Sequence, residues 1–131
     1  MSKKEDSLGP IIVITKVKIK EGERRDYLEI ATQTSMSIKA SEKGILHQTI
    51  DLDESDPLVM IWSEVFEDEK ALAAHLNNPP YSLYIANHSF LGESFQQEIY
   101  GHLSETTLIL SKSIQKRVKH FPSIYGYSRI K

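Results

Sequence analysis

The feature that most constrains the fold of this sequence is the order in which its hydrophobic periodicity changes. Ile11 to Lys20 alternates between apolar and polar residues, which is typical of a half-buried β-strand. Glu23 to Lys43 instead places apolar residues three and four positions apart, so this segment is predicted to be an amphipathic helix. Gly44 follows directly, and we expect it to end the helix in the left-handed conformation.

A hairpin is predicted after this helix. The strands Ile45–Leu52 and Leu58–Phe66 are separated only by the turn-rich segment Asp53–Pro57, so they should pair antiparallel. Asp68 is well placed to cap a second helix, which must end before Pro79.

The last third of the chain completes the pattern. Tyr81 to Phe95 keeps helical spacing, and Thr106 to Ile114 alternates and is predicted to be the fourth strand. The order is therefore strand, helix, strand, strand, helix, strand. This order predicts an α+β fold of the ferredoxin-like β-α-β-β-α-β type, in which helices cover one face of an antiparallel sheet.

The other face of the sheet also needs a cover, because the third strand is apolar on both sides. Its side chains point one way at Leu58, Met60, Trp62 and Phe66, and the other way at Val59, Ile61 and Val65. A homodimer with two sheets face to face would bury both sets. We expect residues 1–10 to be an extended or disordered segment, 11–114 to be the domain, and the basic, aromatic tail 115–131 to reach the partner.

Composition excludes several classes of function. The chain has 131 residues, which suits one domain, and a net charge of -2, which gives no reason to expect nucleic acid or an anionic membrane as a partner. It has no cysteine, so disulfides, thiolate metal sites and a cysteine nucleophile are excluded. No apolar stretch approaches the ~20 residues that span a bilayer, and we expect a cytoplasmic protein.

The strongest candidates for chemistry are Glu64 and His75. Glu64 is two residues from Trp62 and so points to the same face of its strand, among apolar neighbours. A buried carboxyl there could act as a general acid or base, or it could simply hold a backbone amide or a basic side chain. His75 shares a helical stripe with Leu72 and Leu76 within plausible reach of Glu64, although a packing role is the alternative.

Further polar and aromatic residues could bind a ligand. The candidates for contact with a planar molecule are Asn77, Tyr81, Tyr84 and His88, alongside Trp62. The alternative is that they fill the core or end a helix. The sequence has no phosphate loop, no G-x-G-x-x-G, no G-x-S-x-G and no recognised histidine spacing for a metal, so no cofactor and no metal site is predicted.

Three short motifs resemble those of the antibiotic biosynthesis monooxygenase family. They are Glu42-Lys43-Gly44 before the second strand, Trp62-Ser63-Glu64-Val65-Phe66 at the end of the third, and Glu69-Lys70-Ala71-Leu72-Ala73-Ala74-His75-Leu76 in the next helix. The resemblance covers roughly Ile11 to Ile114 and implies a dimeric α+β barrel. Haem-degrading members have an asparagine on the first strand and a tryptophan on a helix, and this chain has neither feature.

The resemblance, together with the polar residues, leads to two hypotheses. The first is a cofactor-independent monooxygenase that oxidises a small aromatic phenol or quinol with molecular oxygen. His75 or Glu64 would take a proton from the hydroxyl, while Trp62, Tyr81 and Tyr84 would hold the ring. The second is a non-catalytic dimeric binding or stress-related protein that binds a hydrophobic metabolite.

Overall fold

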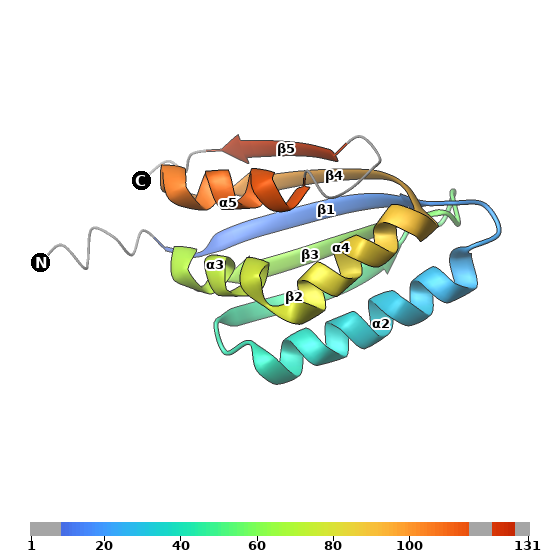
Figure 1. The fold of residues 1–131 in the computed structure, drawn as a ribbon, viewed down its shortest axis with the longest axis horizontal. Coiled ribbons are helices and arrows are strands. Elements are labelled where there is room, and N and C mark those ends of the chain that lie inside the picture. The colour runs from blue at the N-terminus through green and yellow to red at the C-terminus, as the bar shows by residue number, and fades with distance from the viewer. Residues whose placement is uncertain (1–8, 116–121, 128–131) are drawn as a thin grey trace, which may run out of the picture.

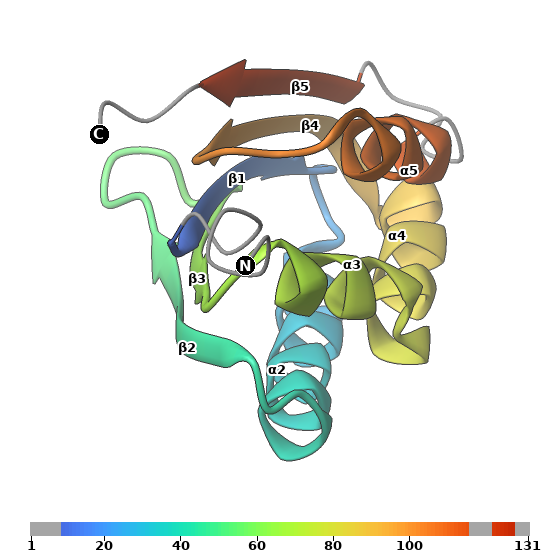
Figure 2. The same cartoon turned by 90° about the vertical axis from the view of Figure 1, so that its left-hand side faces the viewer.

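The computed structural model describes residues 9–115 and 122–127, and in them a five-stranded sheet carries helices on one face (Figures 1 and 2). The elements in chain order are β1 (Ile11–Ile19), α2 (Arg24–Ser41), β2 (Ile45–Leu52), β3 (Val59–Phe66), α3 (Glu69–Asn77), α4 (Pro79–Leu91), β4 (Gly92–Tyr100), α5 (Glu105–Gln115) and β5 (Pro122–Tyr127). None of the described helices is long and apolar enough to cross a membrane.

The strand order in the sheet is β2-β3-β1-β4-β5. β1 lies at the centre and pairs antiparallel with β3 and β4, and β2 pairs antiparallel with β3. These four strands have the order of a ferredoxin-like unit, so the predicted α+β fold is confirmed. β5 adds a parallel strand beside β4 at the edge of the sheet.

The prediction for the fourth strand was wrong. Residues from Thr106 to Ile114 lie in helix α5, and the fourth strand is formed by residues 92–100, part of which was predicted to be helical. Thr107 and Ser111 are both buried and lie four positions apart, so the inward face of helix α5 carries hydroxyl side chains. In β4 the buried side chains include Gln97, whose Nε2 donates a hydrogen bond to the hydroxyl of Thr15 across the sheet. A polar residue at this inward position interrupts the alternation of apolar and polar residues that would have indicated a strand.

Gly44 does not adopt the expected left-handed conformation, since the described glycines with positive φ are Gly9, Gly22 and Gly101. Its role is steric. A Cβ atom on Gly44 would lie 2.4 Å from the Cβ atom of Ala71, so α3 crosses the start of β2 too closely for a side chain. α2 itself ends at Ser41, and the backbone of the next residue is extended.

The polar residues around α3 behave largely as predicted. The Asp68 side chain accepts a hydrogen bond of 2.9 Å from the backbone N–H of Ala71, which caps the helix. α3 ends before Pro79, and the two prolines then begin α4, where a missing N–H costs nothing. α3 and α4 therefore meet at a sharp corner around Asn78.

The helices cover the face of the sheet that carries Val13 and Val17, and no described element covers the opposite face (Figure 2). That opposite face carries half-buried apolar side chains, among them Ile12, Ile14 and Ile61. Most of the predicted N-terminal segment, and residues 116–121 and 128–131 of the predicted tail, lie outside the described residues. The described part of the tail contains β5.

Candidate functional site

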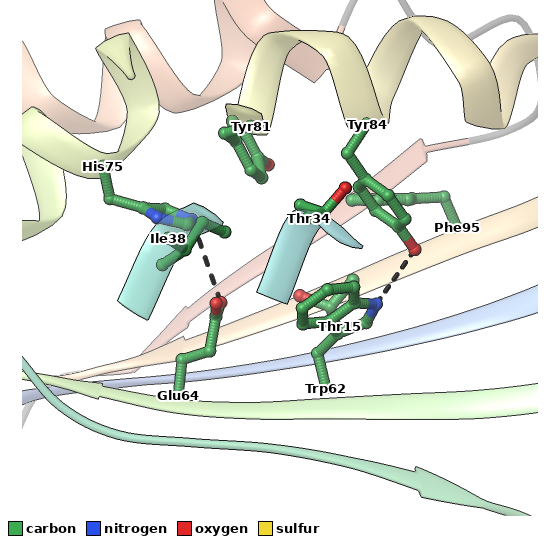
Figure 3. Close-up of a pocket in the computed structure, with 9 residues that line it drawn as sticks. All are labelled: Thr15, Thr34, Ile38, Trp62, Glu64, His75, Tyr81, Tyr84 and Phe95. Atoms are coloured by element: carbon green, nitrogen blue, oxygen red, sulfur yellow. Dashed lines mark hydrogen bonds and ion pairs between the residues drawn. The ribbon is translucent and has the colours of Figure 1, made fainter. Parts of the chain in front are cut away.

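A cavity lies between the sheet and the helices α2, α3 and α4 (Figure 3). Its empty volume is about 260 Å³, which includes space open to solvent. The part that a whole water molecule can enter is small and has room for about one water. The lining residues are Thr15, Thr34, Ile38, Trp62, Glu64, His75, Tyr81, Tyr84 and Phe95.

Glu64 enters the cavity from β3, and its carboxylate is held by neighbours on the same face. It pairs across the sheet with Gln48, whose Nε2 donates a hydrogen bond of 2.8 Å to Oε2 of Glu64. Ser35 on α2 donates a hydrogen bond of 2.6 Å to Oε1 of Gln48, which fixes the orientation of the amide. Glu64 is only 4% exposed, so this bond compensates part of the cost of burying a carboxylate.

His75 lies between two carboxylates. Its Nδ1 is 2.9 Å from Oε1 of Glu42, and its Nε2 is 3.9 Å from Oε1 of Glu64 (Figure 3 shows the second contact). The expected proximity of His75 and Glu64 is therefore found. Asn78 donates a hydrogen bond of 2.8 Å to Oε2 of Glu42, so that the second carboxylate is also held in place.

These charges set the protonation of His75. Burial by itself lowers the pKa of the imidazole, but the charge of Glu64 and the hydrogen bond and charge of Glu42 outweigh burial, so the pKa of His75 lies above its ordinary value. A neutral His75 that donates its Nδ1–H to Glu42 presents the Nε2 lone pair towards Glu64 and the cavity. Such an imidazole can accept a proton from a hydroxyl group bound there.

Aromatic side chains form the rest of the wall. Trp62 Nε1 donates a hydrogen bond of 2.9 Å to the hydroxyl oxygen of Tyr84, and the two rings meet edge to face. The ring of Tyr81 lies against the ring of His75, with 4.7 Å between their centroids. Burial raises the pKa of Tyr84 well above its ordinary value, so its phenol is neutral.

Two of the predicted ligand-binding residues do not line the cavity. His88 is fully buried behind Tyr84, and its Nδ1 lies 2.7 Å from the hydroxyl of Tyr27. Asn77 is exposed on the last turn of α3, where its side chain donates to the carbonyl of Ala73. The structure thus brings together the other five predicted residues and leaves these two aside.

Several residues of the site were not identified by analysis of the sequence. Glu42 was noted only as part of a motif, because nothing in the sequence shows that its side chain reaches His75. Gln48 had a usable signal, since it is two residues from Ile50 and therefore on the inner face of its strand. Phe95 was assigned to a helix, and this error hid its place in the cavity wall.

Comparison with known proteins decides the family. Residues 10–87, more than half of the chain, match the family model described as antibiotic biosynthesis monooxygenase. The chain belongs to the antibiotic biosynthesis monooxygenase family. The matched region includes the whole Glu42–His75–Glu64 arrangement and ends within α4. None of the curated proteins matches this chain.

Solved structures share the fold at low sequence identity. A protein from Bacteroides thetaiotaomicron, provisionally named as a member of the same family, has a TM-score of 0.64 at 15% identity, covering 67% of this chain and 84% of its own. A similarly named protein from Caulobacter crescentus has a TM-score of 0.66 at 16% identity, with 74% and 92% covered. One from Deinococcus radiodurans has 0.64 at 16%, with 69% and 89% covered. These likenesses establish the fold.

Proposed function

We propose that this family member is a cofactor-independent monooxygenase that oxidises a small aromatic phenol or quinol with molecular oxygen. The observation that carries the proposal is the position of His75, a buried imidazole held between two carboxylates at the end of a cavity with aromatic walls. Family membership supports the reaction class.

In this proposal His75 is the general base. Glu42 accepts the Nδ1–H and so fixes the ring and its tautomer, which leaves Nε2 to take the hydroxyl proton of the substrate. Glu64 then faces the imidazolium that forms and stabilises its charge. Trp62 and Tyr81 provide flat apolar surface against which the ring is oriented.

The substrate itself supplies the electrons. Once deprotonated, the electron-rich ring passes an electron to oxygen, and the resulting substrate radical and reduced oxygen combine through a new C–O bond. The adduct is a peroxide, and once it is protonated its O–O bond breaks as the same carbon loses its hydrogen. One oxygen atom then stays in the product as a carbonyl, and the other leaves as water. The proton taken by His75 returns to the oxygen that departs as water, so the base is regenerated.

Binding requires the cavity to open, because its resting interior accepts about one water and an aromatic ring is larger. Tyr81 lies at the start of α4, just after the corner at Asn78. We propose that this corner moves to admit the ring. Protection of the α4 amides from hydrogen exchange should then change when a ligand binds.

Oxygen consumption tests the catalytic assignment. The wild-type protein and His75→Ala are assayed with a panel of hydroquinones and phenols, and Asn77→Ala serves as a control on the exposed side of α3. We expect turnover in the wild type and the control and a loss of at least about 10²-fold in His75→Ala, the usual contribution of a general base. Equal rates in all three, or no turnover with any substrate, would overturn the proposal.

A non-catalytic binding protein is the second candidate. One observation favours it: both polar groups of the site already have partners, Glu64 in Gln48 and His75 in Glu42. A hydrophobic metabolite would then occupy the cavity without reacting. A thermal shift with aromatic ligands that never turn over would support this function over the enzyme.

We also propose that the protein is a homodimer in which the open faces of two sheets pack together. The half-buried apolar side chains on that face, such as Ile12, Ile14 and Ile61, support this arrangement. In the same proposal, residues 11–114 form the domain and the tail that follows contacts the partner. Sedimentation velocity should show a dimer that Ile14→Lys dissociates; an unaffected dimer would place the interface elsewhere.

A further inference from the structure

A chain of hydrogen bonds leads from the cavity wall into the core, and the proposed oxygenation does not use it. Trp62 donates to the hydroxyl of Tyr84, whose oxygen lies 2.6 Å from the hydroxyl oxygen of Tyr27. Tyr27 in turn lies 2.7 Å from Nδ1 of His88. These four side chains are at most 4% exposed, so bulk water does not compete for the bonds.

Elementary donor and acceptor rules give this chain a direction. The indole of Trp62 can only donate, so the oxygen of Tyr84 accepts from it. If both phenols donate along this chain, Tyr84 donates to Tyr27, and Tyr27 donates to Nδ1 of His88. His88 is thereby the terminal acceptor, with its proton on Nε2.

The same residues are close enough to exchange electrons. The ring centroids of Trp62 and Tyr84 are 5.1 Å apart, and those of Tyr84 and Tyr27 are 5.9 Å apart. Tryptophan and tyrosine are the side chains most easily oxidised by one electron when no cysteine is present, and this chain has none. The first two rings also line the cavity in which oxygen chemistry is proposed.

Oxidation of a buried tyrosine requires a proton acceptor. Burial raises the pKa of both Tyr27 and Tyr84, so neither is available as a phenolate. A phenol that loses an electron becomes a strong acid and must release its proton at once. Water does not reach this buried phenol to accept the proton. The hydrogen bonds that lead to His88 provide an acceptor instead.

The ring of His88 is fixed in place by a glycine. A Cβ atom on Gly92 would lie 2.1 Å from the imidazole, so only glycine allows the ring to lie against the start of β4. Phe95 packs on the same ring, with 5.4 Å between centroids. The acceptor nitrogen is therefore held on the hydroxyl of Tyr27.

We propose that Tyr84 is a redox-active tyrosine whose oxidation by one electron is coupled to a proton shift that ends on His88. The oxidant is an organic or oxygen-derived radical in the cavity, or oxidised Trp62. Tyr84 gives it one electron, its phenolic proton moves to Tyr27, and the proton of Tyr27 moves to Nδ1 of His88. The products are the reduced oxidant, a neutral Tyr84 radical, a neutral Tyr27 and a His88 imidazolium.

The hydrogen-bonded chain Trp62–Tyr84–Tyr27–His88, called the relay below, would store one oxidising equivalent next to the cavity as the Tyr84 radical. A buried imidazolium costs free energy, so the radical forms only with a strong oxidant and is readily reduced again by the return of electron and proton. This radical chemistry does not depend on the proposed oxygenation, because it needs only the described geometry and an oxidant.

Flash photo-oxidation of Trp62 tests the relay, since it is the only tryptophan in the chain. In the wild type the absorption of the tryptophan radical should decay as that of a tyrosyl radical rises, more slowly in heavy water than in light water. Tyr84→Phe should abolish the fast rise. Tyr100→Phe, which removes a tyrosine on the open face of the sheet, should leave it unchanged.

His88→Gln tests the proton acceptor, because an amide can accept the hydrogen bond but is a far weaker base. We expect the tyrosyl radical to form at least about tenfold more slowly, because the phenolic proton then has no base at the end of its path; tenfold corresponds to a barrier that is higher by about 1.4 kcal/mol. Tyr27→Phe should have a similar effect, and it serves if His88→Gln does not fold. An equal rate in these variants, the absence of a solvent isotope effect, or a radical that persists on Trp62 in the wild type would each overturn the proposal.

Discussion

Nδ1 of His75 lies 2.9 Å from a carboxylate oxygen of Glu42, the residue that directly follows the last turn of α2. The contact joins the end of one helix to the last turn of another, 33 positions apart in sequence. It is held from the other side by Asn78 at the corner between α3 and α4. The orientation of the proposed base thus depends on how these helices pack.

Glu42→Gln should make the protein less stable in a pH-dependent way. The pKa of His75 is raised in the folded protein, so the stabilisation by its carboxylate partners is fully present below the unfolded value of 6.5 and is lost as the pH rises through the folded pKa. Urea unfolding of the wild type and Glu42→Gln across this range should therefore converge at alkaline pH. A difference that does not depend on pH would show that His75 is not the titrating group.

The same variant should shift activity if His75 is the base. Removing the carboxylate of Glu42 lowers the pKa of His75, so the rise of kcat/KM with pH should move to lower pH. Nuclear magnetic resonance of the ring nitrogens of His75 reports its pKa and tautomer without any turnover. A pKa of His75 that stays the same in Glu42→Gln would contradict the role given to this contact.

Part of this site could be predicted from the sequence because it rests on short-range geometry. Trp62 and Glu64 share a face since strand residues alternate, and His75 follows Glu64 after one short loop. Relationships of this kind depend only on neighbouring residues, so they hold in the folded protein whatever the distant segments do.

The remainder depends on how distant segments pack. Glu42 reaches His75 only because α2 ends beside α3, and no local pattern contains that information. Helix α5 was mistaken for a strand because Thr106 to Ile114 was interpreted as alternating, although the apolar run Leu108 to Leu110 within it fits a helix as well as a strand. The real fourth strand was concealed by Gln97 at an inward position.

Gln48→Leu should destabilise the fold by about 1–3 kcal/mol, because it removes the amide that donates to buried Glu64. Ser35→Ala is the matched comparison, since it breaks only the bond between Ser35 and the amide and should cost less, about 1 kcal/mol. Urea unfolding at neutral pH measures both. Equal losses would mean that the carboxylate of Glu64 is not the group that needs the amide.

Asp68→Ala should cost about 1 kcal/mol through loss of the helix cap, because the backbone N–H of Ala71 would have no acceptor in the first turn of α3. Asp68→Asn retains an oxygen at the same place and should be close to wild type. Since α3 carries His75, the alanine variant should also raise hydrogen exchange in this helix. Comparable stability of the alanine and asparagine variants would show that the cap contributes little.

Gly44→Ala should be destabilising by about 1–3 kcal/mol, because the new methyl group would lie 2.4 Å from the Cβ atom of Ala71 and would push α3 away from the start of β2. Ala71→Gly alone should cost about 1 kcal/mol through helix propensity. The double variant restores the space that the first change fills, so its loss should be smaller than the sum of the two single losses. Unfolding free energies of all four proteins give this coupling. Strictly additive losses would mean that the two residues do not limit the approach of the helix that carries His75.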